Sequence, residues 1–234
     1  MGRRRTDERC ARVVLLVGPS GSGKTYLARS VGLPILALDD FYRADTDPAM
    51  PIGTDGRIDW DDPASWDGDA ALDALEDLCC DEQVEVPDYS IAHNRAVGTK
   101  VVARGGATVV VAEGIFAAEL IAPLRAEGLL ADALLIEQGR WVTFGRRLWR
   151  DLREGRKAPW YLVRQGWAKT RSEPAVVAHQ LALGARPTSK DDARLRLAEL
   201  AAAQVPGATT THSIATDTAT APASARATPI ERTA

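Results

Sequence analysis

One eight-residue segment has the composition and spacing of a binding site for a nucleotide's phosphates. Residues 18–25 read GPSGSGKT, which fits G-x-x-x-x-G-K-[ST], and they lie between an apolar run and a segment with helical spacing. Glycines in this pattern let successive backbone N–H groups point at an anion near the positive end of a helix. A glycine-rich turn that only caps a helix would not need the Lys-Thr pair. The expected nucleotide contacts are Gly18, Ser20, Gly21, Ser22, Gly23, Lys24 and Thr25.

Three side chains near this loop have the chemistry of phosphoryl transfer. We expect Lys24 to reach the β- and γ-phosphates and the Thr25 hydroxyl to ligate Mg²⁺. Asp39 follows the apolar run PILAL, so it should lie at the carboxyl edge of a parallel sheet, where ligands bind. A carboxylate there can accept the proton of an acceptor hydroxyl and assist Mg²⁺. The alternative is an Asp-Asp pair that only opens a turn.

Glu113 ends a second apolar run, VVVAE, and is the corresponding acidic residue of another strand. We expect it to hold Mg²⁺ or its waters, the alternative being a plain strand-end carboxylate.

Arginines recur at steps of one and three between residues 146 and 156, so several share one helix face. Such a face can simply be solvated, but beside a γ-phosphoryl group it can neutralise developing charge and exclude water. Asp151 is expected to orient one of these arginines. The arginines are Arg146, Arg147, Arg150, Arg153 and Arg156.

The elements that must position these residues alternate between strand-like and helix-like patterns. Apolar runs at 12–17 and 34–38 flank the loop and its helix, which is the opening of a βαβ unit. Residues 68–80 have an amphipathic helical pattern, and residues 43–67 read as one long loop. The whole pattern predicts an α/β fold with a doubly wound, mostly parallel sheet of about five strands.

Four further segments complete the pattern. Residues 84–90 should form a short strand and residues 131–137 another, with a helix near 117–128 before the second. The runs TKVVA and ATVVVAEG flank a Gly-Gly pair, which indicates either a hairpin or a return into the main sheet.

Length and composition limit the domain organisation and the partners. The 234 residues, 45% of them hydrophobic, suit one large domain, expected at 12–203 with a lid at about 141–158. Residues 1–11 should be an N-terminal tail and residues 204–234 a disordered Ala/Thr/Pro-rich tail. A net charge of −3 gives no global reason to bind nucleic acid or an anionic membrane.

The cysteines and the N-terminus bear on localisation. Cys10, Cys79 and Cys80 are an odd number with two adjacent, so we expect reduced, structural thiols. We identify neither a signal peptide nor a run of about 20 apolar residues, so we expect a soluble cytoplasmic protein.

Taken together, six segments resemble the uridine kinase (uridine-cytidine kinase) family of P-loop nucleoside kinases. The resemblance covers roughly residues 12 to 171, and matched order and spacing carry more weight than any one motif. The segments are GPSGSGKT, DDFY at 39–42, DWDDPASWD at 59–67, PDYSIAHNR at 87–95, VVVAEGI at 109–115 and RRLWRDLREGR at 146–156.

The resemblance implies ATP and Mg²⁺ as cofactors and a role for each matching residue. Asp39 would be the catalytic base and a magnesium-associated carboxylate. Asp61 would bind the ribose hydroxyls, and Tyr89 and His93 would line the base pocket. Glu113 would complete the magnesium shell. In the lid, Arg147, Arg150 and Arg156 would stabilise the transferred group, with Arg147 and Arg156 also contacting substrate. Trp60 beside Asp61 is able to stack on a planar base, and Arg95 to hold its segment or the nucleoside.

Two departures from the family pattern lie outside the expected ATP site. The step from Tyr89 to His93 is four residues where the family has five, and Glu154-Gly155-Arg156 stands where the family has Glu-Arg-Gly-Arg.

The expected function is ATP-dependent phosphorylation of a nucleoside 5′-hydroxyl, converting uridine or cytidine to UMP or CMP. The alternatives are a kinase of another small alcohol, such as pantothenate, a pentose phosphate or nicotinamide riboside, and a regulatory ATP-binding protein. The acidic balance argues against a nucleic-acid-dependent ATPase. The resemblance also favours a homo-oligomer.

Overall fold

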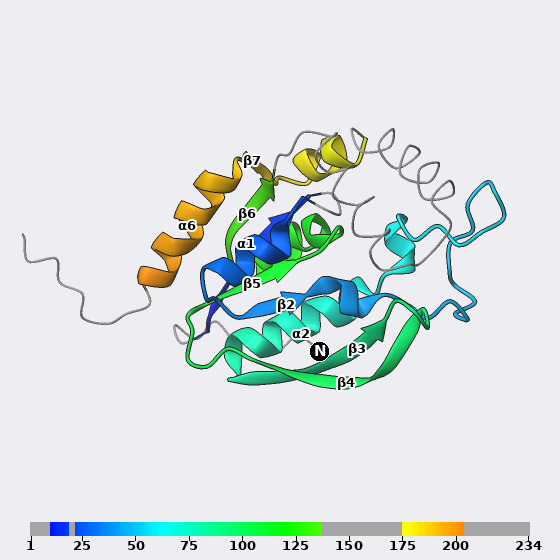
Figure 1. Cartoon of the computed structure of the whole chain (residues 1–234), viewed down its shortest axis with the longest axis horizontal. Helices are drawn as coiled ribbons and strands as arrows, with labels where there is room; N and C mark the ends of the chain where they lie inside the picture. The colour runs from blue at the N-terminus through cyan, green and yellow to red at the C-terminus, as the bar shows by residue number, and fades with distance from the viewer. Residues whose placement is uncertain (1–9, 19–21, 137–174, 204–234) are drawn as a thin grey trace, which may run out of the picture.

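Five strands form a central sheet in which every neighbouring pair is parallel, in the order β2-β5-β1-β6-β7 (Figure 1). The computed structural model describes residues 10–18, 22–136 and 175–203. The strands are β1 (Arg12–Val17), β2 (Ile35–Ala37), β5 (Val109–Glu113), β6 (Leu130–Ile136) and β7 (Arg186–Thr188). The predicted fold class and the strand number are therefore confirmed.

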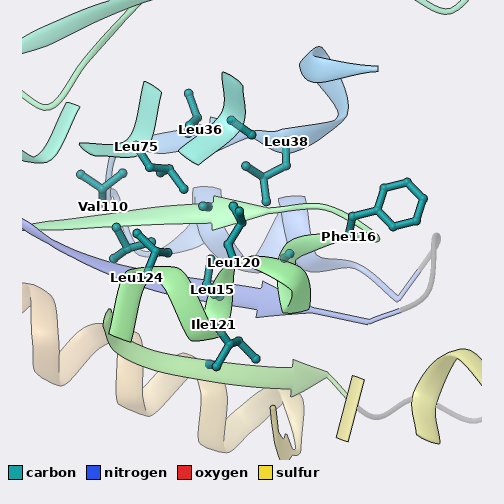
Figure 2. Close-up of a cluster of buried hydrophobic side chains, with 14 of the residues drawn as sticks. Leu15, Leu36, Leu38, Leu75, Val110, Phe116, Leu120, Ile121 and Leu124 are labelled. Carbon is teal, nitrogen blue, oxygen red and sulfur yellow. The ribbon is translucent and has the colours of Figure 1, made fainter. Parts of the chain in front are cut away.

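Helices cover both faces of this sheet because alternate side chains of each strand point to opposite sides. One face packs under α2 (Gly68–Cys80), η3 (Ala117–Leu120) and α3 (Ile121–Ala126), where Leu15, Leu75 and Leu124 belong to one buried cluster (Figure 2). The other face packs under α1 (Lys24–Ser30) and α6 (Lys190–Ala202). The central strand β1 is buried from Val13 to Val17, which accounts for its continuous apolar run.

A second, two-stranded antiparallel sheet is formed by β3 (Gln83–Ser90) and β4 (Arg95–Ala103). The sequence left open whether the runs TKVVA and ATVVVAEG form a hairpin with each other or the chain returns to the main sheet. The return occurs: TKVVA belongs to β4, which pairs with β3, and the chain then enters the main sheet as β5. Val86 on β3 is buried and joins the main core beside α2.

The helix predicted at 68–80 forms with those bounds as α2. Its amino end is capped by Asp67, whose side chain accepts a hydrogen bond from the Ala70 N–H at 3.1 Å. The helix predicted near 117–128 is instead a 3₁₀ turn, η3, followed by the short α3.

The long loop predicted at 43–67 is present, but parts of it are ordered by a 3₁₀ turn and by hydrogen bonds. It follows the 3₁₀ turn η1 (Leu38–Phe41) and includes a second one, η2 (Pro63–Ser65). The indole N–H of Trp66 donates to the Leu38 carbonyl at 2.8 Å, which ties the end of the loop back to η1.

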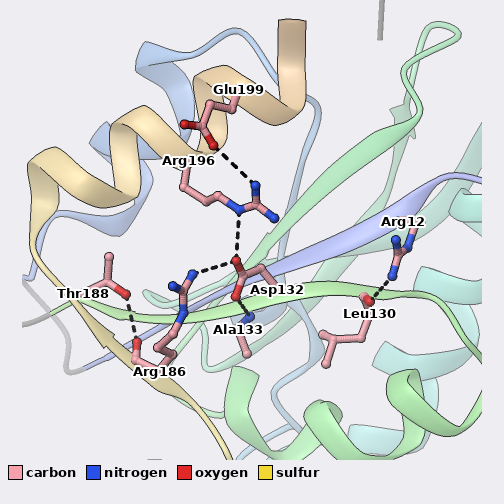
Figure 3. A network of polar contacts seen from close by, with 8 residues as sticks. All are labelled: Arg12, Leu130, Asp132, Ala133, Arg186, Thr188, Arg196 and Glu199. Carbon is pink, nitrogen blue, oxygen red and sulfur yellow. Dashed lines mark hydrogen bonds and ion pairs between the residues drawn. The ribbon is translucent and has the colours of Figure 1, made fainter. Parts of the chain in front are cut away.

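Strand β7 and helix α6 were not predicted from the sequence. Asp132 on β6 holds both, through ion pairs at 2.8 Å to Arg186 on β7 and 3.2 Å to Arg196 on α6 (Figure 3). Helix α6 begins after Ser189, whose hydroxyl accepts from the Asp192 N–H.

The cysteine expectation is corrected by the structure. Cys10 and Cys80 form a disulfide, with Cα atoms 4.5 Å apart, and Cys79 is free and buried. The Ala11 N–H donates to the Cys79 carbonyl at 2.7 Å, which brings the chain before β1 beside the end of α2. The two partners are 70 residues apart in the sequence, so spacing alone did not indicate the pair.

Several expectations lie outside the described residues. These are the lid at about 141–158 with its arginines and Asp151, the loop residues Ser20 and Gly21, the first nine residues of the proposed N-terminal tail and the tail at 204–234. Within the described ranges, no helix combines the length and apolarity needed to cross a membrane.

Candidate functional site

The described ends of the phosphate-binding loop have the backbone shape that its glycines allow. Gly18 ends β1 with φ of +136°, and Gly23 precedes α1 with φ of +89°. A Cβ atom on Gly18 would lie 3.3 Å from the Ile136 carbonyl oxygen, so the close approach of β1 and β6 favours glycine here. The buried Lys24 ammonium donates to the Gly18 carbonyl at 2.8 Å, which holds its charge beside the loop.

The side chains of Thr25 and Glu113 are in direct contact. The Thr25 hydroxyl donates to the Glu113 carboxylate with an O–O distance of 2.6 Å. The parallel register places Glu113 opposite Leu16 of β1 and Ala37 of β2, so the three strands present their carboxyl ends at one edge. This edge is where open α/β sheets bind ligands.

Asp39 lies on η1, two residues beyond the end of β2. Its carboxyl group still reaches solvent, but surrounding protein atoms remove much of its hydration, and this raises its pKa to about 6. The negative charge of Glu113 raises the pKa further, whereas the Lys24 charge and a hydrogen bond from the Ile115 N–H act against the rise. Asp39 is thus an ionisable group next to both the loop lysine and the Glu113 carboxylate.

An aromatic cluster centred on Tyr42 lies near Asp39. Its ring centroid is 5.8 Å from that of Trp60, 5.9 Å from that of Tyr89 and 5.9 Å from that of Phe116. Burial raises the pKa of the Tyr42 phenol, and the charges of Asp39 and then Asp61 raise it further. Tyr42 therefore lies near Asp39, the expected base, and near Asp61, the expected ribose contact.

Sequence reasoning missed Tyr42, to which it gave no role. Its signal in the sequence is its position as the tyrosine of the DDFY motif, three residues after Asp39.

The predicted acceptor residues are brought together only in part. Tyr89 contacts Tyr42, and the exposed Asp61 lies near enough to influence it. Asp61 lines a hollow of about 280 Å³ with Gly53, Thr54, Asp55, Ile58, Asp59 and Trp60. His93 is exposed in the β3–β4 turn, where its Nδ1 lies 2.8 Å from the Ser90 hydroxyl, and Arg95 is exposed at the start of β4.

Sequence reasoning also missed an ion pair beside Asp39. The Lys100 ammonium on β4 lies 2.8 Å from each carboxylate oxygen of the buried Asp40. The two residues are 60 positions apart in the chain, and no local pattern indicates the pair.

The residues at the sheet edge suit a magnesium–nucleotide complex. Among the residues that the structure describes, no group of three His, Cys, Asp or Glu side chains could hold a metal ion. Mg²⁺ is normally held by one or two carboxylates together with phosphate oxygens and waters, and Thr25, Asp39 and Glu113 fit that pattern. The Ser22 hydroxyl is fully buried and has no hydrogen-bond partner in the described part of the chain. Buried hydroxyls are normally hydrogen-bonded, so this group also suits a bound polar ligand.

No family model matches the chain. A uridine kinase from Bacillus mycoides is 30% identical over 149 residues, which are 61% of this chain and 68% of that protein. The chain belongs to the uridine kinase family.

Other relatives match a smaller share of their own length. The uridine kinase of Schizosaccharomyces pombe is 32% identical over 152 residues, and that of Saccharomyces cerevisiae is 30% identical over 154 residues. The chain spans 32% and 29% of these two family members, respectively.

The fold is shared with a solved structure from Silicibacter sp. TM1040, assigned as a fructose transport system kinase. The TM-score is 0.55 at 20% identity, over 74% of this chain and 89% of that chain.

Proposed function

We propose that this chain is an ATP-dependent phosphotransferase that transfers a γ-phosphoryl group to the 5′-hydroxyl of a uridine- or cytidine-type nucleoside. The observation that carries the proposal is the place of Asp39. Its carboxyl group is influenced by Lys24 and Glu113 on the phosphate side and in turn influences Tyr42 on the aromatic side. A carboxylate near both a phosphate-binding loop and an aromatic cluster suits transfer from a nucleotide to an organic hydroxyl.

The residues of the sheet edge would hold the nucleotide and its metal ion. The Gly18–Thr25 loop and Lys24 would bind the phosphates, and Thr25, Asp39 and Glu113 would hold Mg²⁺ or its waters. When bound, Mg²⁺ supplies positive charge that neutralises the phosphate oxygens. The lid arginines Arg147, Arg150 and Arg156 are proposed to add charge stabilisation, as the family resemblance implies.

Asp39 is proposed to take the proton of the acceptor hydroxyl. A carboxyl pKa of about 6 leaves the group mostly ionised at neutral pH, yet makes it a stronger base than an ordinary aspartate. Asp61 would bind the ribose hydroxyls, and Tyr89 and His93 would line the base pocket together with Tyr42.

A kinase of another small alcohol is the second candidate, and one observation favours it. His93 lies in an exposed turn, bonded to Ser90, and its step from Tyr89 is one residue shorter than the family's. A changed base pocket would alter the acceptor while keeping the phosphate chemistry.

A coupled ADP-release assay with Mg-ATP tests both candidates. The acceptors are uridine, cytidine, pantothenate, nicotinamide riboside and ribulose 5-phosphate. With the preferred acceptor, Asp39→Asn should lower turnover by about 10²–10⁴, the range of general-base catalysis. Asp73→Asn, which changes an exposed aspartate of α2, is the matched control and should retain turnover.

Each outcome decides between the candidates. Turnover with a nucleoside that is lost in Asp39→Asn supports the proposal, and turnover with another acceptor favours the second candidate. An unchanged rate in Asp39→Asn contradicts the assignment of the base. ATP binding without turnover on any acceptor would favour a regulatory ATP-binding protein.

A further inference from the structure

The Lys100 ammonium connects two parts of the candidate site that lie on separate elements. It contacts both oxygens of Asp40 at 2.8 Å and the nearer oxygen of Asp88 at 3.4 Å. Asp40 is the neighbour of Asp39 on η1, and Asp88 is the neighbour of Tyr89 on β3. One cation therefore bridges the segment that carries the proposed base and the strand that carries a proposed acceptor contact.

Burial makes the contact with Asp40 the more important of the two. The Asp40 side chain is 10% exposed and the Lys100 side chain 42%. A carboxylate with so little hydration needs a charged or hydrogen-bonding partner, and removal of that partner is costly. The Asp88 side chain is 51% exposed, and ion pairs at such sites contribute little.

The register of the hairpin explains why a lysine points toward the core. Lys100 pairs with Val86, and directly opposed residues of an antiparallel pair share a face. Val86 is buried in the main core, so Lys100 lies on the same core-facing side, where it reaches Asp40. The hairpin tip is tied separately, by the hydrogen bond from the Asp45 N–H to the Asn94 carbonyl at 3.0 Å.

We propose that Lys100 is a positioning residue for the acceptor, holding the β3–β4 hairpin against η1 through Asp40. The inference rests on the proposed phosphotransferase function and adds the residue that sets the spacing between Tyr89 and Asp39. The ion pairs of Lys100 are with Asp40 and Asp88, whereas the nucleotide is assigned to other residues, Lys24, Thr25 and Glu113 among them. Its loss should therefore weaken use of the acceptor and leave use of ATP intact.

Steady-state kinetics of three single variants tests this role. Lys100→Met keeps most of the length of the side chain and removes its charge, and it should raise KM for the acceptor about tenfold, with KM for ATP within about twofold. Lys100→Arg should keep most of the wild-type KM because the charge remains. Arg186→Met removes an ion pair of the same 2.8 Å length at the opposite edge of the sheet and should change neither KM.

A double variant separates positioning from loss of stability. Lys100→Met leaves Asp40 buried without its cation, which can destabilise the fold. In Asp40→Asn with Lys100→Met no uncompensated charge remains, so folding should recover while the acceptor KM stays raised. An acceptor KM within about twofold of wild type in folded Lys100→Met, or an equal rise in both KM values, overturns the proposal.

Hydrogen exchange distinguishes failure of this inference from failure of the proposed function. If the wild-type chain phosphorylates none of the acceptors, the proposed function fails and the kinetic test with it. The hairpin contact is then tested alone, because Lys100→Met should speed amide exchange in β3 and β4 relative to wild type and Arg186→Met. Unchanged exchange in both strands would show that Lys100 does not hold the hairpin.

Discussion

At the scale of single residues, burial and two charged neighbours give Asp39 its properties. Burial and the Glu113 charge favour the neutral carboxyl, whereas Lys24 favours the ionised form. The first two effects win, so the folded chain holds the proton more tightly than the unfolded chain does. A group whose ionised form is disfavoured by folding is typical of sites that use it for chemistry.

This raised pKa predicts how stability depends on pH. Between the ordinary value of 3.8 and about 6, the folded chain binds more protons at Asp39, so the contribution of this group to the free energy of unfolding falls as pH rises. Asp39→Asn removes that penalty. Without nucleotide or metal ion, the Tm of the variant minus that of wild type should be larger at about pH 7 than at about pH 4. Thermal unfolding at the two pH values measures this, and a difference that shrinks as pH rises would contradict the assignment.

Thr25 allows a second test at this scale. Thr25→Val keeps the shape of the side chain and removes the hydroxyl that bonds to Glu113. If this hydroxyl helps to hold Mg²⁺, the apparent magnesium affinity in the kinase assay should fall about 10- to 100-fold. Thr25→Ser keeps the hydroxyl and should retain most of the affinity, and equal losses in both variants would argue against a role for the hydroxyl.

At the scale of elements, Gly114 sets how closely β5 and η1 approach. A Cβ atom at this position would lie 2.9 Å from the Leu38 Cβ and 3.3 Å from an Asp39 carboxylate oxygen. The chain after Glu113 can therefore pass directly beside η1, which carries the proposed base, only because residue 114 is glycine.

Gly114→Ala should lower both stability and turnover, because the added methyl group pushes η1 away from β5. Overpacking of this kind costs about 1–3 kcal/mol in the free energy of unfolding. Gly98→Ala is the matched control, since a Cβ there meets nothing within 4 Å, and it should change stability by about 0.5 kcal/mol or less. Denaturant unfolding measures both, and equal effects would show that the approach of η1 and β5 is not tight.

The elements that were predicted from the sequence are those whose signals are local. Helix α2 has an amphipathic pattern and an Asp67 cap, and β1 has a continuous apolar run, so both could be placed. Strand β7 has only three residues, one of them Pro187, and forms by pairing with β6. A strand that short is defined by its partner and not by its own composition.

The same distinction holds for the candidate site. Lys24, Thr25, Asp39 and Glu113 could be predicted because strand ends and the loop pattern place them on one edge. The contacts of Lys100 with Asp40 and of Tyr42 with Tyr89 depend on how the hairpin docks on η1, which no local pattern describes. Residues 137–174 lie outside the described part of the chain, so the lid arginines stay a prediction.

At the scale of the whole molecule, the Cys10–Cys80 disulfide closes a long stretch of chain that includes the loop, η1 and α2. For a sequence separation of 70 residues, loop-closure entropy corresponds to about 4 kcal/mol of stabilisation in the chain-entropy model. Burial raises the pKa of the neighbouring Cys79 thiol to about 12, which keeps it from attacking the disulfide as a thiolate.

Removal of this disulfide should lower stability without changing the site. Cys10→Ser should reduce the free energy of unfolding by up to about 4 kcal/mol and should make it insensitive to added thiol. Peptide mapping of the oxidised wild-type chain should find the bond between Cys10 and Cys80. Mapping to Cys79 instead, or a stability that thiol leaves unchanged in the wild type, would contradict this account.

The β3–β4 hairpin stands outside the five-stranded sheet, and its two strands lie beside α2 at the side of the molecule away from α6 (Figure 1). The sheet that carries the phosphate-binding loop does not depend on hydrogen bonds to this hairpin. Because the proposed acceptor residues Tyr89 and His93 lie on this hairpin, a change of acceptor would not require a change in the phosphate-binding loop. Exchange of this hairpin between two members of the family, with Lys100 and Asp40 exchanged together, would change the proposed acceptor contacts and keep the phosphate-binding loop.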